Sequence, residues 1–294
     1  MKLKDEQKEE FRTQGFLIAR GALSDADLQP VIDELSGWID ARAQQLHAED
    51  KVEDLHKHEP FAKRYGLLFG QCREIGSGLD IMHYRGRAMF KFLHNENLLE
   101  LLESLIGPEL TCNPIQHLRA KPPLSQEGDT GPSFHNAPWH QDAGVMMEEA
   151  EGSDVVTCWL PIGRATQEMG CMEVIPGLVE TGYLRHLRAG GTTIDPEVIP
   201  DVEPVVAQCE KGDLVLMSRF TPHRSTPNYS DECRWSLDLR YQPTGQHTGR
   251  TGHPDFIVRS QSNPASEMCD YEEWCRLWVD AFNNPKGHVG HRSP

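Results

Sequence analysis

Two patterns of hydrophobic and polar positions divide the chain near residue 110. In residues 24–39, apolar side chains recur every three or four positions, which predicts an amphipathic helix with Ser24 as its N-terminal cap. Residues 95–106 show the same periodicity and are followed by Gly107-Pro108, so they predict a second helix that ends there. Beyond residue 110 the apolar runs become short and are separated by turn residues, which is typical of strands.

The strand-like part of the chain predicts the fold class. Many short strands with helices at both ends indicate a mainly β protein with flanking α-helices and a double-stranded β-helix core of the jelly-roll, cupin-like type. A glycine-bearing segment, 64–92, is expected to be a loop that covers the site. We expect one domain over 1–294, with a helical N-terminal flank (1–109), a barrel core (110–243) that carries a lid-like insertion (177–204), and a C-terminal helical extension (244–294). The predicted strands are 110–121, 155–161, 171–176, 205–209, 214–218 and 234–242, and Ser266 is expected to cap the last helix.

The charge balance and the lack of long apolar runs limit the binding partners and the cellular location that we expect. With 45 acidic and 29 basic residues, the chain has a net charge of −16, which disfavours nucleic acid and anionic membranes because both are polyanions. The same charge argues against a coenzyme A thioester as the substrate. No apolar run approaches the roughly 18 residues of a membrane span, and the start lacks the apolar core of a signal peptide, so we expect a cytoplasmic protein. The eight cysteines form no Cys-x-x-Cys pair and are expected to be free thiols, several of them buried.

The segment His140-Gln141-Asp142 is the first candidate for chemistry. On an extended strand, side chains two residues apart point to the same face, so His140 and Asp142 can reach one metal ion. His223 lies 83 residues further on (223 − 140), shortly after a predicted buried strand. Two imidazoles and one carboxylate that leave other metal positions open are the ligand set of non-haem Fe(II) oxygenases. By contrast, His288 and His291 lie in a polar tail and are expected to have no role.

The second candidate lies on the last predicted strand, Arg-Trp-Ser-Leu-Asp-Leu-Arg-Tyr (234–241). Its alternation places Arg234, Ser236, Asp238 and Arg240 on one face and apolar residues on the other. Arg234 offers a two-pronged donor and Ser236 a third hydrogen bond, which suits a carboxylate. A dicarboxylic 2-oxo acid could chelate iron with one end and be held here by the other. The simpler interpretation is that the Arg and Asp side chains of this face pair with each other.

These motifs, taken in order, resemble the phytanoyl-CoA dioxygenase (PhyH) family of Fe(II)/2-oxoglutarate-dependent oxygenases. The resemblance runs from Thr111 to Tyr241, and the helical flanks extend it over most of the chain. Two positions depart from the family pattern: Leu178-Val179 stand where members commonly have Ser/Thr-His, and His117 stands where they often have another residue type. The matching segments are Lys121-Pro122-Pro123, His140-Gln141-Asp142, Trp159, 169–177, Glu210-Lys211-Gly212-Asp213, His223 and Arg234.

The resemblance implies a reaction and a set of site residues. It implies a dioxygenase that uses Fe(II), 2-oxoglutarate and O2, hydroxylates an unactivated C–H bond and releases succinate and CO2, with ascorbate expected to stimulate turnover. The altered loop after Pro176-Gly177 and the acidity of the chain favour a small or secondary-metabolite substrate over a fatty-acyl-CoA. The implied roles are iron ligands for His140, Asp142 and His223, binding of the distal 2-oxoglutarate carboxylate for Arg234 and Ser236, and further cosubstrate contacts for Trp159 and His117.

Two other function classes stay open at this point. A cupin-like metal-binding module without oxygenase activity would keep the three ligands but have no use for Arg234 and Ser236. A zinc hydrolase would use His135 together with His140 and His223, which requires the loop that carries His135 to fold back onto the site.

Overall fold

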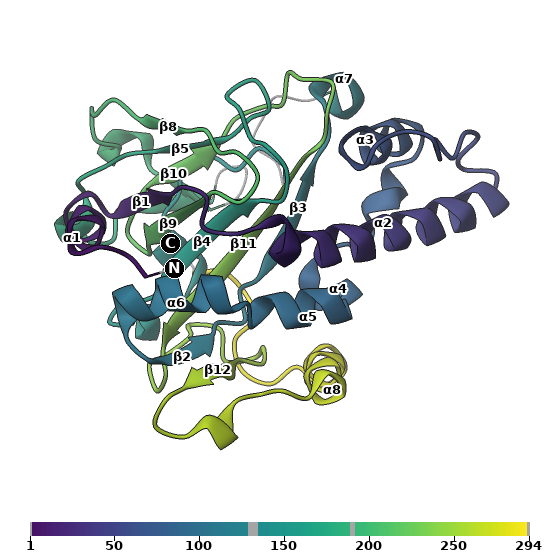
Figure 1. The fold of residues 1–294 in the computed structure, drawn as a ribbon. Helices are drawn as coiled ribbons and strands as arrows, with labels where there is room; N and C mark the ends of the chain where they lie inside the picture. The colour runs from purple at the N-terminus through teal and green to yellow at the C-terminus, as the bar shows by residue number, and fades with distance from the viewer. Residues whose placement is uncertain (1, 129–134, 189–191, 293–294) are drawn as a thin grey trace.

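Strand β11 (Arg234–Pro243) organises the fold of this computed structural model, which describes residues 2–128, 135–188 and 192–292 (Figure 1). It lies in the larger of two main sheets and has partners on both sides. In spatial order this sheet contains β1 (Phe16–Ala19), β9 (Leu214–Ser218), β4 (Val156–Pro161), β11, β2 (Glu109–Cys112) and β12 (Phe256–Ser260), and β3 (His117–Lys121) also pairs with β11. The smaller sheet contains β10 (His223–Ser225), β5 (Met172–Val174) and β8 (Val205–Ala207), while β6 (His186–Arg188) pairs with β7 (Thr192–Ile194).

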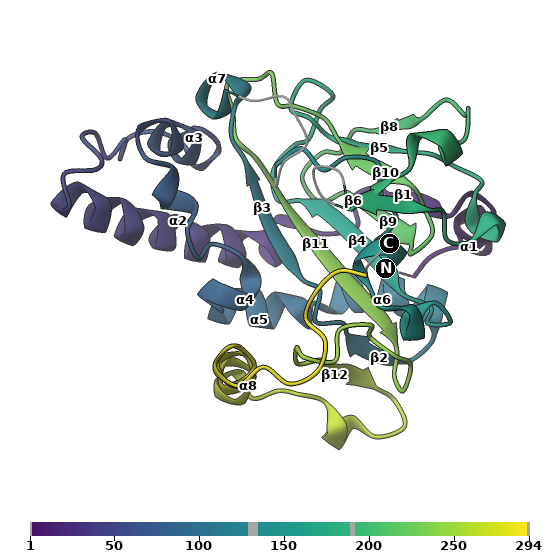
Figure 2. The ribbon, with the colours of Figure 1, turned by 180° about the vertical axis from the view of Figure 1, so that it is seen from behind.

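Helices cover one face of the larger sheet. Figure 2, seen from behind, shows β3, β11 and β4 on the near side with the long helix α2 beyond them. The helices are α1 (Asp5–Gln14), α2 (Asp25–Ala48), α3 (Phe61–Gln71), α4 (Ile81–Tyr84), α5 (Arg87–Leu93), α6 (Glu96–Ile106), α7 (Leu124–Glu127) and α8 (Tyr271–Asn283). Short 3-10 turns are η1 (Arg73–Gly76), η2 (Asp142–Val145), η3 (Glu148–Ala150), η4 (Val179–Thr181), η5 (Pro196–Val198) and η6 (Pro264–Ser266).

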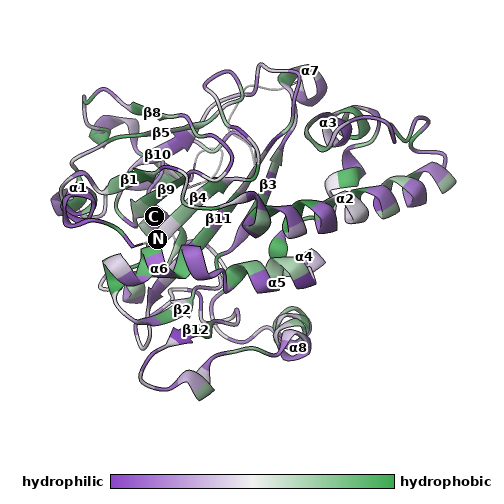
Figure 3. Cartoon of the chain, viewed as in Figure 1, coloured by the Kyte–Doolittle hydropathy of each residue, from purple (hydrophilic) through white to green (hydrophobic). Residues whose placement is uncertain are grey.

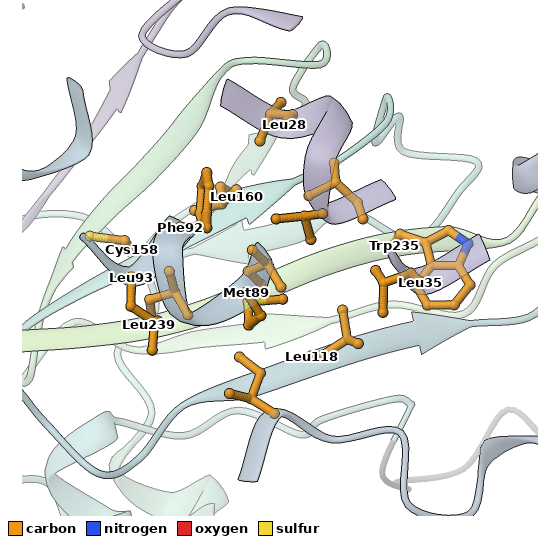
Figure 4. Packing of buried hydrophobic residues seen from close by; sticks show 14 of the residues in the cluster. Leu28, Leu35, Met89, Phe92, Leu93, Leu118, Cys158, Leu160, Trp235 and Leu239 are labelled. Carbon is orange, nitrogen blue, oxygen red and sulfur yellow. The ribbon is translucent and has the colours of Figure 1, made fainter. Parts of the chain in front are cut away.

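The main hydrophobic core lies between these helices and the sheet. Alternation along β11 turns Trp235, Leu237 and Leu239 toward the helices, and all three are buried in one cluster with apolar residues of α2 and α5. Figure 4 shows this packing, with Leu28 and Leu35 of α2 on one side. The central strands β4 and β9 are coloured largely hydrophobic in Figure 3, as expected for strands that are buried on both faces.

The opposite face of the larger sheet looks toward the smaller sheet. Trp159, Val215 and Met217 from the larger sheet pack there against Met172 and Val174 of the smaller one, in a second apolar cluster. The polar residues of β11 lie on this same face because they alternate with the core residues. The fold therefore places a polar strip next to an apolar cluster between two sheets.

The predicted fold class, a mainly β core with flanking helices, is confirmed. The helices expected after Ser24 and over 95–106 are present as α2 and α6, and Ser24 forms a reciprocal capping box with Asp27. The described strands form open sheets, so the core is not a closed barrel. All eight cysteines are free and five of them are buried, as expected. Over the described ranges, no helix has the length and apolarity needed to cross a membrane.

Three local predictions are wrong. Segment 64–92 is largely helical rather than a loop, because Gly66 and Gly70 do not break α3 but leave room for Pro123 and Gln126 to pack closely against it. The single strand expected over 110–121 is two strands, β2 and β3, since Pro114 lies between them and cannot donate a ladder hydrogen bond. The cap of the last helix is Asp270, which accepts hydrogen bonds from two backbone amides, and not Ser266.

Candidate active site

The structure brings the predicted metal ligands together between the two sheets. His140 does not lie on a long strand; it forms an isolated antiparallel bridge with His223, with backbone N–O distances of 3.0 and 2.9 Å. Asp142 begins the turn η2. One ligand atom from each of His140, Asp142 and His223 lies within 4.8 Å of the others, and the described residues contain no other such trio of His, Cys, Asp or Glu side chains.

Gln141, between the two candidate ligands, fixes this segment. Its side-chain amide donates to the carbonyls of Gly182 and Phe220 at 2.9 and 2.6 Å and accepts from the amide of Leu184 at 2.8 Å. Its own backbone amide donates to His186 Nε2 at 3.1 Å. These bonds hold Gln141 away from the cavity, so its two neighbours are directed toward it.

Both imidazoles present a free Nε2 atom. The Nδ1 atom of His140 lies 2.8 Å from the carbonyl of Pro138, and that of His223 lies 2.9 Å from the carbonyl of Thr221. A carbonyl only accepts hydrogen bonds, so Nδ1 carries a proton in each ring and Nε2 is the atom left to bind a metal. Burial, followed by electrostatic repulsion from the neighbouring His223 ring, lowers the pKa of His140 to about 3, which keeps the His140 ring neutral near pH 7.

Asp142 is held as a carboxylate by Arg240. The Arg240 Nη2 atom donates to Asp142 Oδ1 at 2.5 Å, and the hydroxyl of Thr157 donates to Oδ2. The two charged side chains are 0% and 6% exposed. Burial alone would raise the pKa of Asp142, but the charge of Arg240, the neighbouring His223 and the hydrogen bond from Arg240 together outweigh burial and lower it. The trio offers two imidazole nitrogens and one charged carboxylate oxygen, a ligand set that suits a divalent metal.

Arg234 lies on the same face of β11 as Arg240 and has unused donors. It is 3% exposed, yet its Nε and Nη1 groups have no hydrogen-bond partner in the described part of the chain, and the same holds for the hydroxyl of Ser236. The guanidinium lies 5.3 Å from the ring centre of Trp159. Unpaired buried donors are rare in folded proteins and indicate a missing acceptor. The simpler interpretation, in which the Arg and Asp side chains of this face pair with each other, does not hold for Arg234. Asp238, the Asp of this face, pairs instead with Arg119 at 3.3 Å.

A second basic side chain, Lys121, lies beside Arg234. The two residues are direct partners in the β3–β11 register, and Lys121 is fully buried. Its ammonium group donates to the hydroxyl of Ser225 and the carbonyl of Thr226, and no carboxylate pairs with it in the described residues. Burial, and then the positive charge of Arg234, lowers the pKa of Lys121 well below its ordinary value. An anion placed here would therefore be favourable for both side chains.

A cavity of about 260 Å³ connects these groups. His117 also lines it, but its ring hydrogen-bonds Asp80 at 2.7 Å, and its register partner on β11 is Asp238. His117 therefore lies four residues along β3 from Lys121, or about 13 Å at the usual rise per residue. The lining residues are Ile115, His117, Arg119, Lys121, His135, Ala137, Pro138, His140, Val145, Thr157, Trp159, Met172, Thr192, Met217, His223, Ser225, Arg234, Asp238, Arg240 and His291.

The lining of the cavity corrects the expectations for three parts of the chain. Segment 64–92 contributes no residue to the cavity, because its helices pack on the far face of the sheet. His135 lines the cavity but does not join the metal trio; its Nδ1 atom lies 2.8 Å from a carboxylate oxygen of Glu127. His291, which was expected to have no role, lies at the cavity. The support of the Asp142 carboxylate by Arg240 and Thr157 also has no local sequence signal, because these residues lie 98 and 15 positions away from Asp142.

Comparison with protein families and curated proteins gives consistent matches. A family model described as Phytanoyl-CoA dioxygenase (PhyH) matches residues 11–236. Methylphosphonate hydroxylase from Gimesia maris is 39% identical over 88 residues, which cover 29% of this chain and 32% of that protein. The 1-deoxypentalenic acid 11-beta-hydroxylase of Streptomyces arenae is 32% identical over 168 residues, covering 53% of this chain and 57% of that protein. The chain thus spans between about a third and somewhat over half of the length of these two relatives.

Solved structures share the fold. The apo structure of the non-heme monooxygenase ThoJ aligns with a TM-score of 0.64 over 95% of this chain and 94% of that chain, at 18% sequence identity. At this identity the agreement concerns the fold alone. The two sheets with flanking helices are therefore an arrangement that a non-haem oxygenase also has.

Proposed function

The chain belongs to the phytanoyl-CoA dioxygenase family of Fe(II)/2-oxoglutarate-dependent oxygenases, and we propose that it hydroxylates a C–H bond of a small organic molecule. When bound, iron and 2-oxoglutarate supply the oxidising chemistry: O2 and 2-oxoglutarate are consumed, succinate and CO2 are released, and the C–H bond becomes C–OH. The protein holds the reactants in a fixed geometry and shields them from water. The observation that carries the proposal is the presence, along one cavity, of three side chains that could hold a metal ion and a buried arginine with unused donors.

His140, Asp142 and His223 would hold the iron. Both imidazoles hold Nδ1 on a backbone carbonyl, which leaves Nε2 as the ligand atom, and the carboxylate keeps its charge through Arg240. Three protein ligands leave room for a chelating cosubstrate and for O2. The Nδ1 hydrogen bonds to backbone carbonyls fix both ring orientations before any metal arrives, which is the usual support for metal-ligating histidines.

Arg234 and Ser236 would bind the distal carboxylate of 2-oxoglutarate. Their unpaired donors and their burial fit an anion with two oxygen atoms. Lys121 would add charge at the same end, and Trp159 would form one wall of this part of the cavity. We assign His117 to the substrate end rather than to the cosubstrate, because it lies four residues along β3 from Lys121.

A small substrate fits the space better than a fatty-acyl-CoA. About 260 Å³ is close to the lower end of the roughly 300–1,000 Å³ typical of ligand pockets, and it must also hold the cosubstrate. The two curated relatives are named for methylphosphonate and 1-deoxypentalenic acid, which are both compact acids. We also propose that 1–294 works as one catalytic domain with 177–204 as the lid, since Leu184 and Gly182 of that insertion bind Gln141 directly.

Turnover of 2-oxoglutarate in the presence of candidate substrates tests this function. We expect Fe(II)-loaded protein to form succinate above its background rate when a small organic acid from a panel is accepted, and to give one hydroxylated product per succinate. Asp142→Ala should lose this activity, whereas Asp154→Ala, at an exposed carboxylate, should keep it. Succinate formation that no compound of the panel stimulates, or that survives Asp142→Ala, would argue against the proposal. Stimulation by a fatty-acyl-CoA alone would overturn the assignment of a small substrate.

A further inference from the structure

The C-terminal segment after α8 returns to the active site. Figure 2 shows this segment, in yellow, crossing the near face of β11 on its way to the chain end. Its residue His291 lies at the mouth of the cavity, where it is still exposed, and it lines the same space as the metal trio. The family match ends at residue 236, so this wall of the cavity lies outside the part that matches the family model.

Contacts on both sides of His291 fix the segment. On one side, His288 donates its backbone amide to the Thr251 hydroxyl at 3.0 Å and accepts from the amide of Gly252 at 2.8 Å. A Cβ on Gly252 would meet Val289 and His288, so the absence of a side chain there permits this close approach. On the other side, Arg292 forms ion pairs with Glu148 and Glu151 of the η3 region.

The Arg292 side chain also packs on the body of the protein. Its guanidinium lies 4.1 Å from the ring centre of Tyr183, and its side chain is only 14% exposed. Between these anchors, the ring of His291 hydrogen-bonds the hydroxyl of Thr192 at 2.7 Å. These contacts therefore hold the C-terminal segment in place along the cavity.

The end of the cavity near His291 is available for the primary substrate, because Arg234 and its register partner Lys121 are assigned to the cosubstrate. His291 hydrogen-bonds Thr192 and lies close to His117 and Arg250. Ile115 and Val145 line the same cavity, so the lining combines two apolar side chains, two imidazoles and a hydroxyl. Such a lining can bind a compact molecule that has both a hydrocarbon part and a polar group.

An unbalanced positive charge lies next to this end. Arg250 is 7% exposed, and in the described residues its guanidinium hydrogen-bonds only the carbonyls of Val145 and Val289, at 2.7 and 3.1 Å, while its Nε has no partner. No carboxylate of the described residues pairs with it, unlike Arg240, which has Asp142. Burial, and then the charge of Arg240, lowers the pKa of Arg250 to about 10, so the group stays charged at neutral pH. A nearby anion would offset this buried charge.

We propose that His291 contacts the primary substrate directly and that the anionic group of the substrate lies at this end of the cavity, in the field of Arg250. This inference rests on the proposed oxygenase function and deepens it, because it names an anionic substrate and a specificity residue. The C-terminal segment is then part of the substrate site, and its sequence selects the substrate.

Binding of small anions to the chain of residues 1–294 tests the inference. This chain is loaded with Mn(II) and 2-oxoglutarate, which prevents turnover, and is titrated calorimetrically with methylphosphonate, with propionate and with neutral propionamide. We expect at least one anion to bind and propionamide not to bind. In His291→Ala the anion should bind about tenfold more weakly, the effect of one lost hydrogen bond to a charged group. His291→Gln, which keeps a donor, should recover part of this loss.

The controls separate a substrate contact from damage to the site. His288→Ala removes the other tail imidazole, whose side chain does not line the cavity, and should bind the anions as the wild type does. All variants should bind 2-oxoglutarate with unchanged affinity. Three results would each overturn this inference and leave the proposed function intact. The first is binding of 2-oxoglutarate without binding of any anion. The others are an anion affinity in His291→Ala equal to that of the wild type, and propionamide binding as tight as that of the anions. Failure of the wild type to bind 2-oxoglutarate would overturn the proposed function, and this inference with it.

Discussion

Replacing Arg240 with methionine tests the electrostatic support of the metal site. The change keeps the volume of the side chain and removes the charge that faces Asp142 at 2.5 Å. Because the two side chains are 0% and 6% exposed, water compensates little for the loss. Breaking a buried ion pair by removing one partner typically costs about 3–5 kcal/mol. We expect about 3 kcal/mol here, near the lower limit, since Asp142 keeps its hydrogen bond from the Thr157 hydroxyl.

The assay is urea denaturation of the metal-free protein at pH 7.5. Arg240→Met should lower the free energy of unfolding by about 3 kcal/mol, while the double variant Arg240→Met/Asp142→Leu should recover most of it, because no unpaired charge remains. Addition of Mn(II) should stabilise Arg240→Met more than the wild type, because the positive ion takes over part of the role of Arg240 beside Asp142. The gain in stability cannot exceed the binding free energy of the ion.

Two results would refute this reasoning. A loss below about 1 kcal/mol in metal-free Arg240→Met would mean that the pair contributes as little as a surface ion pair. A double variant that is no more stable than the single one would mean that the damage comes from packing and not from the unpaired carboxylate.

Three further predictions follow from the same structure. His140 is protonated only near pH 3 in the folded protein but near pH 6.5 in the unfolded chain, so the free energy of unfolding of the metal-free protein should fall as the pH is lowered from about 6.5 to about 3. Urea denaturation should show a weaker fall in His140→Gln, and an equal pH dependence in the variant and the wild type would contradict the assignment. In metal analysis after dialysis, His223→Ala should lose the bound ion and His135→Ala should keep it, whereas loss in both would restore the zinc-hydrolase interpretation. Leu237→Ala, at a fully buried position, should cost about 2–5 kcal/mol in urea denaturation, and the exposed Leu187→Ala should change little; similar values for both would mean that the core lies elsewhere.

The placement of the candidate site residues could be predicted from short-range patterns. The two-residue spacing was enough to predict that the His140 and Asp142 side chains lie close together. The segment itself is a β-bridge followed by a 3-10 turn and not a strand. Alternation along β11 assigned Arg234 and Ser236 to the polar face and Trp235 to the core, because a strand has only two faces. These features depend on neighbours in sequence, which is why a single sequence reveals them.

Features that depend on distant contacts could not be predicted. The support of Asp142 by Arg240 comes from a pairing across 98 residues, and no local pattern encodes it. His291 looks like part of a polar tail until the anchors of Arg292 and Gly252 bring it to the cavity. In the same way, Gly66 is a helix breaker by its intrinsic propensity, and only the close packing of Pro123 explains its place inside α3.

The measurement that tests the central claim most directly is an anaerobic titration of Fe(II)-loaded protein with 2-oxoglutarate, followed by the visible metal-to-ligand charge-transfer band. The account predicts a band in the wild type and in Arg164→Ala, a control at an exposed arginine. Arg234→Ala should need at least tenfold more cosubstrate to reach half of the band, since it loses a buried charged hydrogen-bond donor. No band in the wild type, or equal half-saturation in Arg234→Ala, would contradict the account.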